Sequence, residues 1–66
     1  ILAPVIIMLQ GEIAQHLKPG AVFITSGIIN TKEQAVKEAL ASNPELEIIE
    51  TTYQGEWVSV TARKQA

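Results

Sequence analysis

Cysteine and aspartate are absent from the sequence, and histidine occurs once, as His16. Without cysteine the chain can form no disulfide framework, thiol nucleophile, thiolate zinc site or iron–sulfur cluster. A Ser-His-Asp triad or a two-histidine metal site cannot be assembled from these residues either. His16 stands near the end of a predicted helix, where a solvent-facing histidine interacts favourably with the helix C-terminus. We therefore expect no catalytic residue and no metal site within the chain.

Positive charge is also scarce, since five Lys and Arg stand against seven acidic residues and the formal net charge is -2. This balance provides no basic surface for a phosphate backbone, so no direct nucleic-acid binding is expected. The longest apolar run, Val5 to Leu9, is far shorter than the ~20 residues that cross a bilayer, and no cationic signal-peptide segment precedes it. We expect no membrane association and a cytoplasmic location.

Hydrophobic residues, by contrast, make up 47% of the chain, charged residues 18%, and the mean hydropathy is +0.19. This composition favours a packed core over a disordered chain. The 66 residues suffice for one small domain or for part of one. The sequence opens on Ile1-Leu2 without a polar lead-in, which indicates a segment cut from a larger domain.

Two helices are predicted from the apolar periodicity. The first runs from about Pro4 to Leu17, because proline suits a first helical turn and Lys18-Pro19-Gly20 ends the helix. The second covers roughly Thr31 to Ala41, with Asn30 or Thr31 as its N-cap. The apolar faces consist of Leu2, Ile6, Leu9, Ile13 and Leu17 in the first helix and of Ala35, Val36, Ala39 and Leu40 in the second.

Three strands are predicted as well. Ala21 to Thr25 is a continuous apolar run, typical of a strand buried on both faces, and Ser26-Gly27 is expected to end it. Leu46 to Tyr53 and Glu56 to Arg63 indicate an antiparallel hairpin around Gln54-Gly55, because glycine takes the positive φ that a tight turn needs. In the last run the apolar side chains alternate with polar ones and form one face: Val58, Val60 and Ala62.

The order helix, strand, helix, strand, strand predicts an α/β fold with a crossover that leaves the first two strands parallel. The final strand fits between them, which gives a mixed three-stranded sheet ending in an antiparallel hairpin. The far edge of the first strand then stays unpaired, although its composition indicates burial. Because an apolar edge pairs with another strand or self-associates, we expect a missing segment or a second copy to cover it.

Ligands of open α/β sheets bind beyond the carboxyl ends of the strands, which here means the segment Thr25-Ser26-Gly27-Ile28. Gly27 either permits close approach of a ligand or simply completes a turn, and Ser26 has no base nearby in the sequence to activate it. Tyr53 and Trp57 flank the hairpin turn, where a cross-strand aromatic contact is expected, with ligand stacking as the alternative. The acidic residues around the hairpin are interpreted as a solvated face: Glu45, Glu47, Glu50 and Glu56.

Four short strings are informative together: Ile1-Leu2-Ala3, Leu17-Lys18-Pro19-Gly20, Ser26-Gly27-Ile28 and Gly55-Glu56-Trp57-Val58. With the order of the elements, they resemble class I S-adenosylmethionine-dependent methyltransferases, and among these the ribosomal protein L-eleven (L11) methyltransferases. The similarity runs over nearly all of the chain. One departure is Ala21, where that family usually has a second glycine after Leu-Lys-Pro-Gly.

The resemblance implies that residues 1–66 are the C-terminal fragment of a single Rossmann-like catalytic domain, from the helix after its fourth strand to its seventh strand. That fourth strand would cover the bare edge. The glycine-rich loop, the ribose-binding acidic residue and an asparagine of the family lie upstream of this chain. The residues that carry over as pocket neighbours are Ile1, Leu2 and Ala3, which follow that asparagine, with Ile1 and Leu2 beside the cofactor, and Ser26, Gly27 and Ile28 at the lip of the substrate pocket.

The implied activity is transfer of methyl groups from S-adenosylmethionine to amino groups of a large-subunit ribosomal protein. The implied cofactor is S-adenosylmethionine, and the implied partner is that ribosomal protein. The fragment alone is expected to be inactive, because the main cofactor-binding residues are missing from it. Two other hypotheses are a stand-alone α/β interaction module that pairs through its exposed sheet edge and a small α/β domain that senses a small molecule.

Overall fold

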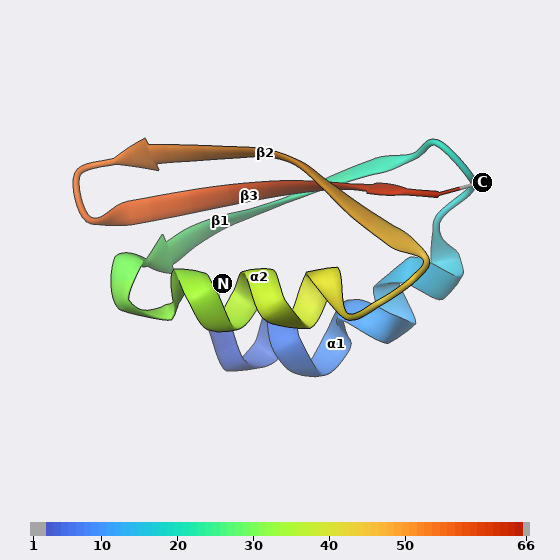
Figure 1. Ribbon diagram of the computed structural model, residues 1–66, viewed down its shortest axis with the longest axis horizontal. Coiled ribbons are helices and arrows are strands. Elements are labelled where there is room, and N and C mark those ends of the chain that lie inside the picture. The colour runs from blue at the N-terminus through green and yellow to red at the C-terminus, as the bar shows by residue number, and fades with distance from the viewer. Residues whose placement is uncertain (1–2, 66) are drawn as a thin grey trace.

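The computed structural model describes residues 3–65 and shows a three-stranded sheet with both helices on one face (Figure 1). The helical elements are α1 (Ala3–His16), η1 (Asn30–Lys32), which is a 3-10 helix, and α2 (Glu33–Ala41). The strands are β1 (Val22–Ile29), β2 (Leu46–Gln54) and β3 (Trp57–Lys64). This arrangement confirms the predicted α/β class and the predicted order of elements. Neither α1 nor α2 is long and apolar enough to cross a membrane, within the residues that the structure describes.

Strand β3 lies in the middle of the sheet and runs antiparallel to both of its neighbours. Strands β1 and β2 therefore point the same way, and the final strand occupies the central place that the sequence predicts. Every hydrogen-bonded pair is antiparallel, so the sheet is mixed only in the sense that its outer strands are parallel to each other. Within residues 3–65 the far edge of β1 has no strand beside it, as expected.

The core lies between the sheet and the two helices. Alternation along β3 directs its apolar side chains toward the helices, and Val60 and Ala62 are completely buried. Helix α2 contributes Val36 and Leu40 from its predicted apolar face. Each large apolar side chain removed from water contributes about 1.5–3 kcal/mol, against which the entropy of ordering must be set. The buried cluster consists of Ala3, Ile6, Ala14, Ile28, Val36, Leu40, Leu46, Val58 and Val60.

Strand β1 is longer than predicted, because Ser26-Gly27 does not end it. The register of β1 against β3 shifts between Thr25 and Ile28, so the two intervening residues form a β-bulge. Gly27 has a φ of 72°, a left-handed conformation that only glycine adopts freely. The buried Thr25 donates its hydroxyl to the carbonyl oxygen of Val60 at 3.0 Å, directly before the bulge. The strand bends at this point and then resumes.

The prediction that β1 is buried on both faces is wrong for the residues that the structure describes. Val22 is 48% exposed and Ile24 is 65% exposed, whereas Thr25 of the same strand is buried. The reason is that both helices cover the same face of the sheet (Figure 1). The opposite face, on which Val22 and Ile24 lie, is called the open face below.

The hairpin of β2 and β3 is confirmed, but its turn is displaced by one residue. Gln54 pairs with Trp57, so the two-residue turn is Gly55-Glu56 instead of Gln54-Gly55. Gly55 supplies the positive φ, 61°, that the turn requires. The glycine was therefore identified correctly, and only its place within the turn differs.

The helix boundaries agree with the sequence to within about two residues, but the capping prediction is wrong. Neither Asn30 nor Thr31 caps α2 with its side chain, because both belong to η1. The N-cap residue of α2 is Lys32, and no side-chain hydrogen bond caps this end. Glu33, in the first turn, places a negative charge at the positive end of the helix dipole instead.

Candidate functional site

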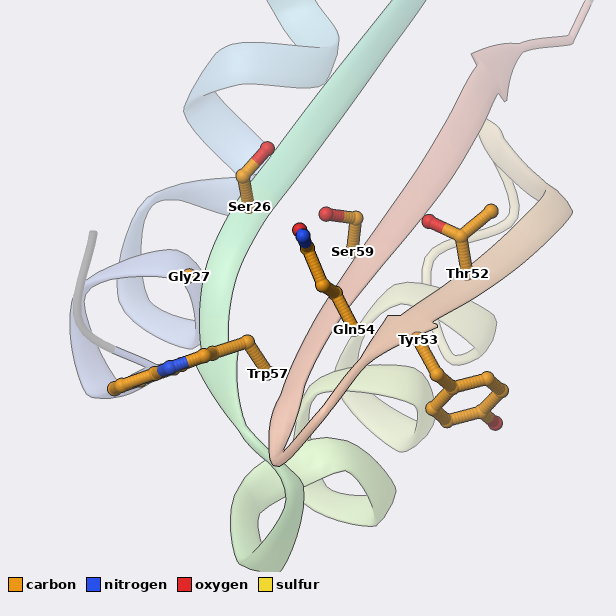
Figure 2. Close-up of a pocket in the computed structure, with 7 residues that line it drawn as sticks. All are labelled: Ser26, Gly27, Thr52, Tyr53, Gln54, Trp57 and Ser59. Atoms are coloured by element: carbon orange, nitrogen blue, oxygen red, sulfur yellow. The ribbon is translucent and has the colours of Figure 1, made fainter.

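The candidate site lies at the carboxyl end of β1, beside the first residues of α1. Ligands of open α/β sheets bind at this end of the strands. Two hollows meet here, and both are lined in part by Gly27 and Trp57. The indole of Trp57 extends across β1 toward the start of α1, at the place where Gly27 has no side chain (Figure 2).

The first hollow is apolar and has a volume of about 310 Å³. It is bounded by the start of α1, the end of β1 and the indole of Trp57, and its one charged lining residue is Lys32. Its lining therefore suits an apolar group with a polar end better than a highly charged ligand. The residues that line it are Ala3, Pro4, Gly27, Ile29, Lys32 and Trp57.

The second hollow is a shallow polar basin of about 580 Å³ on the open face (Figure 2). Its polar lining groups are hydroxyls, an amide and the indole N–H, and none of them carries a formal charge at neutral pH. Among the described residues, the side-chain hydrogen bonds do not involve Ser26, Thr52, Gln54 or Ser59. These groups are free to bind a ligand. The residues that line the basin are Ser26, Gly27, Thr52, Tyr53, Gln54, Trp57 and Ser59.

The predicted cross-strand contact between Tyr53 and Trp57 is wrong. Tyr53 pairs with Val58 and Gln54 pairs with Trp57, and successive pairs of a ladder point to opposite faces of the sheet. The two aromatic side chains accordingly point away from each other (Figure 2). Trp57 is 52% exposed, so its ring is no core residue. Ligand stacking, the alternative role, fits this exposed position.

Tyr53 instead reaches the first turn of α2. Its hydroxyl donates to Oε2 of Glu33 at 2.5 Å, and Nζ of Lys37 lies 2.9 Å from the same oxygen. The hydrogen bond from Tyr53, and then that from Lys37, hold the pKa of Glu33 below its usual value. The same hydrogen bond raises the pKa of Tyr53, and the contact with Glu33 raises the pKa of Lys37.

The residues expected at the substrate pocket have different positions. Ser26 and Gly27 line the polar basin, and Gly27 also lines the apolar hollow. Ile28 is completely buried and belongs to the core, because the bulge turns it toward the helices. Ile1 and Leu2, expected beside the cofactor, lie outside the described residues.

Pro4 and Lys32 were not predicted as site residues. Nothing in their types or spacing indicates a ligand, because only the fold brings the start of α1 next to η1. The two residues line the same apolar hollow although they are far apart in the sequence. For Trp57, the sequence leaves ligand stacking as the alternative to a cross-strand contact. The exposure of Trp57 and its place between the two hollows support ligand stacking.

Within residues 3–65 no group of three or more His, Cys, Asp or Glu residues is placed to hold a metal ion. No acidic residue lines either hollow, so these residues supply no carboxylate for the ribose hydroxyls of a nucleoside cofactor. The described residues therefore do not make a complete site for S-adenosylmethionine.

Comparisons with known proteins agree on one family. The family model described as ribosomal protein L11 methyltransferase (PrmA) matches residues 1–65. The ribosomal protein L11 methyltransferase of Lachnospira eligens is 57% identical over 65 residues, which are 98% of this chain and 20% of that protein. That of Agathobacter rectalis is 53% identical over 64 residues, again 20% of its length.

A solved structure shows the same fold. The crystal structure of ribosomal protein L11 methylase from Lactobacillus delbrueckii subsp. bulgaricus superposes with a TM-score of 0.88 at 26% identity, covering 100% of this chain and 34% of the other. The chain thus spans about a fifth of the length of the curated relatives named above. On this sequence and structural similarity, the chain belongs to the ribosomal protein L11 methyltransferase family.

Proposed function

We propose that residues 1–66 are the C-terminal part of the catalytic domain of a longer protein methyltransferase, called the longer protein below. Its reaction is the transfer of methyl groups from S-adenosylmethionine to amino groups of a large-subunit ribosomal protein, in the cytoplasm. The relatives bear the name of ribosomal protein L11 methyltransferase and are about five times as long as the matched segment, which supports this proposal.

The observation that carries the proposal is the pair of hollows at the carboxyl end of β1. An apolar hollow and an uncharged polar basin share the Trp57 wall, and Gly27 lies between them without a side chain. The acceptor protein presents neutral main-chain groups, which suit the basin, and an aliphatic side chain, which suits the hollow. Methyl transfer depends on holding donor and acceptor in line, so a two-part surface that orients the acceptor is an appropriate contribution.

The cofactor is assigned mainly to residues upstream of Ile1. The two hollows are lined by no carboxylate that could bind the ribose, which supports this assignment. The chain by itself should therefore neither bind S-adenosylmethionine nor catalyse. Its own contribution is the lip of the acceptor pocket, formed by Ser26, Gly27 and Trp57.

Calorimetry and a methylation assay test this proposal. Titration of S-adenosylmethionine into the isolated 66-residue chain should give no measurable heat of binding, whereas the longer protein should bind it. The longer protein should also transfer labelled methyl groups to purified ribosomal protein L11. Micromolar binding by the isolated chain would contradict the assignment of the cofactor site, and no transfer by the longer protein would contradict the activity.

The alternative function is an interaction module that pairs through the free edge of β1. One observation favours it: Val22 and Ile24 are exposed on β1, and no residue of this strand carries a charge that would oppose pairing. The edge of β2, by contrast, carries Glu47 and Glu50. Sedimentation of the isolated chain distinguishes the two readings, because a monomer at high concentration contradicts pairing, and dimers that Ile24→Lys abolishes support it.

A further inference from the structure

The tip of the β2–β3 hairpin is attached to the rest of the fold from two sides. On the β3 side, Trp57 pairs with Ile29, and the amide N–H of Asn30 donates to the carbonyl oxygen of Glu56 at 2.9 Å. On the β2 side, the attachment is the hydrogen bond from Tyr53 to Glu33 at 2.5 Å. The first attachment joins main chain to main chain, whereas the second depends on side chains.

Burial does not hold this tip in place. Every residue from Thr52 to Trp57 is exposed, and β2 is an edge strand with a register irregularity between Ile48 and Glu50. Exposed hairpin ends of this kind open locally at little free-energy cost. The hydrogen bonds that cross to α2 and η1 are therefore what fixes the tip relative to the helix layer.

We propose that Tyr53, Glu33 and Lys37 act as positioning residues, which fix the hairpin tip and thereby hold the Trp57 indole across Gly27. Glu33 begins α2, and its Oε2 accepts from Tyr53 while Lys37 lies 2.9 Å from the same oxygen. Lys37, one turn later on the helix, keeps this carboxylate directed at the hairpin. The proposal rests on the proposed function in one respect, because it assigns Trp57 to the acceptor pocket.

The position of Trp57 follows from this link through the ladder. Tyr53 pairs with Val58 and the adjacent Gln54 pairs with Trp57, so the two aromatic residues occupy neighbouring rungs on opposite faces. Holding Tyr53 against α2 therefore fixes the orientation of the whole tip relative to the helices. It also fixes the position of the Trp57 indole on the open face. A rotated tip would widen or close the apolar hollow, for which the indole is one wall.

An exposed ion pair alone contributes little to stability, so the proposal differs from a simple stabilising role in its kinetic signature. Tyr53→Phe in the longer protein keeps the ring and removes the donor. The expected result is a KM for ribosomal protein L11 raised about fivefold, with kcat within about twofold and unchanged affinity for S-adenosylmethionine. Glu33→Ala should reproduce this effect, and Glu33→Gln should rescue most of it, because its amide oxygen still accepts from Tyr53.

A matched control is available at the other end of the sheet. Glu47 accepts from Arg63 at 2.9 Å, and both side chains are exposed. Glu47→Gln weakens a carboxylate–cation pair that is more exposed than Glu33–Lys37 and lies away from the two hollows, so it should leave KM unchanged. An equal rise of KM in Glu47→Gln and Tyr53→Phe would overturn the proposal.

Hydrogen exchange of the longer protein tests the positioning independently of activity. Tyr53→Phe should speed exchange of the amides from Gly55 to Ser59 by about fivefold or more, whereas Glu47→Gln should leave them unchanged. Unchanged exchange and unchanged KM in Tyr53→Phe would overturn the proposal. If the wild-type protein transfers no methyl group, the proposed function fails, and exchange at the tip still decides whether Tyr53 positions it.

Discussion

The ammonium group of Lys64 lies against the C-terminal end of α1, where its Nζ donates to the carbonyl oxygen of Ala14 at 2.6 Å. The last turns of a helix leave carbonyl groups without intrahelical partners, and a cation there also opposes the negative end of the helix dipole. The same ammonium lies 2.6 Å from Oε1 of Glu45. One side chain of β3 thus joins α1 to the loop before β2.

Replacing this ammonium should be costly. The Lys64 side chain is only 12% exposed, so Lys64→Met should lower the free energy of unfolding by about 1–2 kcal/mol. Arg63→Met is the control, because the Arg63–Glu47 pair is exposed and its loss should cost about 0.5 kcal/mol or less. Urea denaturation of the longer protein measures both, and equal losses would contradict the helix-end role of Lys64.

Removal of the Trp57 ring should affect substrate binding more than folding. The ring is 52% exposed, so Trp57→Ala should lower the free energy of unfolding by about 1 kcal/mol, below the 3–5 kcal/mol typical of a buried aromatic residue. Leu40→Ala, in which a completely buried side chain is truncated, should cost about 2–5 kcal/mol. Denaturation curves and KM for ribosomal protein L11 give the comparison. A Trp57→Ala loss as large as that of Leu40→Ala would place the ring in the core of the longer protein.

Filling the gap at the bulge should impair activity. Gly27→Val would crowd the pocket lip but would also strain the backbone, because valine does not tolerate a φ of 72°. Gly27→Asn is the better variant, since asparagine adopts this conformation at a cost of about 1 kcal/mol. It should reduce kcat/KM by about tenfold or more by placing a side chain between the two hollows.

Gly20→Asn is the control for this variant. Gly20 also has a positive φ, 86°, and a side chain there would meet open space. It lies before β1, at the opposite end of the strand from Gly27. The Gly20 variant should therefore show a similar stability and an unchanged kcat/KM. If both variants lose the same activity, backbone strain and not crowding is the cause.

The Glu33 cluster should give a defined pH dependence. The hydrogen bond from Tyr53, followed by that from Lys37, holds the pKa of Glu33 below its ordinary value of 4.5. Its contribution to stability is therefore complete above about pH 5 and is lost as the pH falls through the lowered pKa. Tyr53 and Lys37 have raised pKa values, so their contribution is lost at the alkaline end, as the pH rises through those values.

An NMR titration of the Glu33 carboxyl carbon measures the acidic limb directly. The expected midpoint lies below 4.5 in the wild-type protein and moves up toward it in Tyr53→Phe, since the largest cause of the shift is removed. A Glu33 midpoint that Tyr53→Phe leaves in place would mean that the hydrogen bond is not formed in solution.

The elements that the sequence predicted correctly are those in which local pattern and tertiary burial agree. Alternation of apolar side chains defines β3, with Val58, Val60 and Ala62 all buried. The spacing of Val36 and Leu40 likewise defines the buried face of α2. In both cases the apolar side chains repeat with the period of the element and lie on the face that packs into the core. The same pattern therefore predicts both the type of the element and its buried face.

The features that were not predicted depend on contacts between distant segments. Ser26-Gly27 has the composition of a strand end, and only pairing with β3 shows that it is a bulge inside β1. The apolar hollow forms because η1 and the start of α1 meet, which no local pattern at Pro4 or Lys32 encodes. Tyr53 and Trp57 lie on opposite faces of the hairpin whether the turn is Gln54-Gly55 or Gly55-Glu56, so strand alternation already separates them, and only the contact of Tyr53 with Glu33 depends on the distant helix.

The central place of β3 has a consequence for the order in which the fold is made. Strands β1 and β2 form no hydrogen-bonded ladder with each other. Among the described strands, the partner of both is β3, which is synthesised last. Within residues 3–65, β2 therefore has no partner strand and β1 has none on its β3 side until β3 leaves the ribosome, and only then can these three strands form one sheet. Loss of residues 57–64 would remove the whole sheet, in contrast to loss of an edge strand, which would only narrow it.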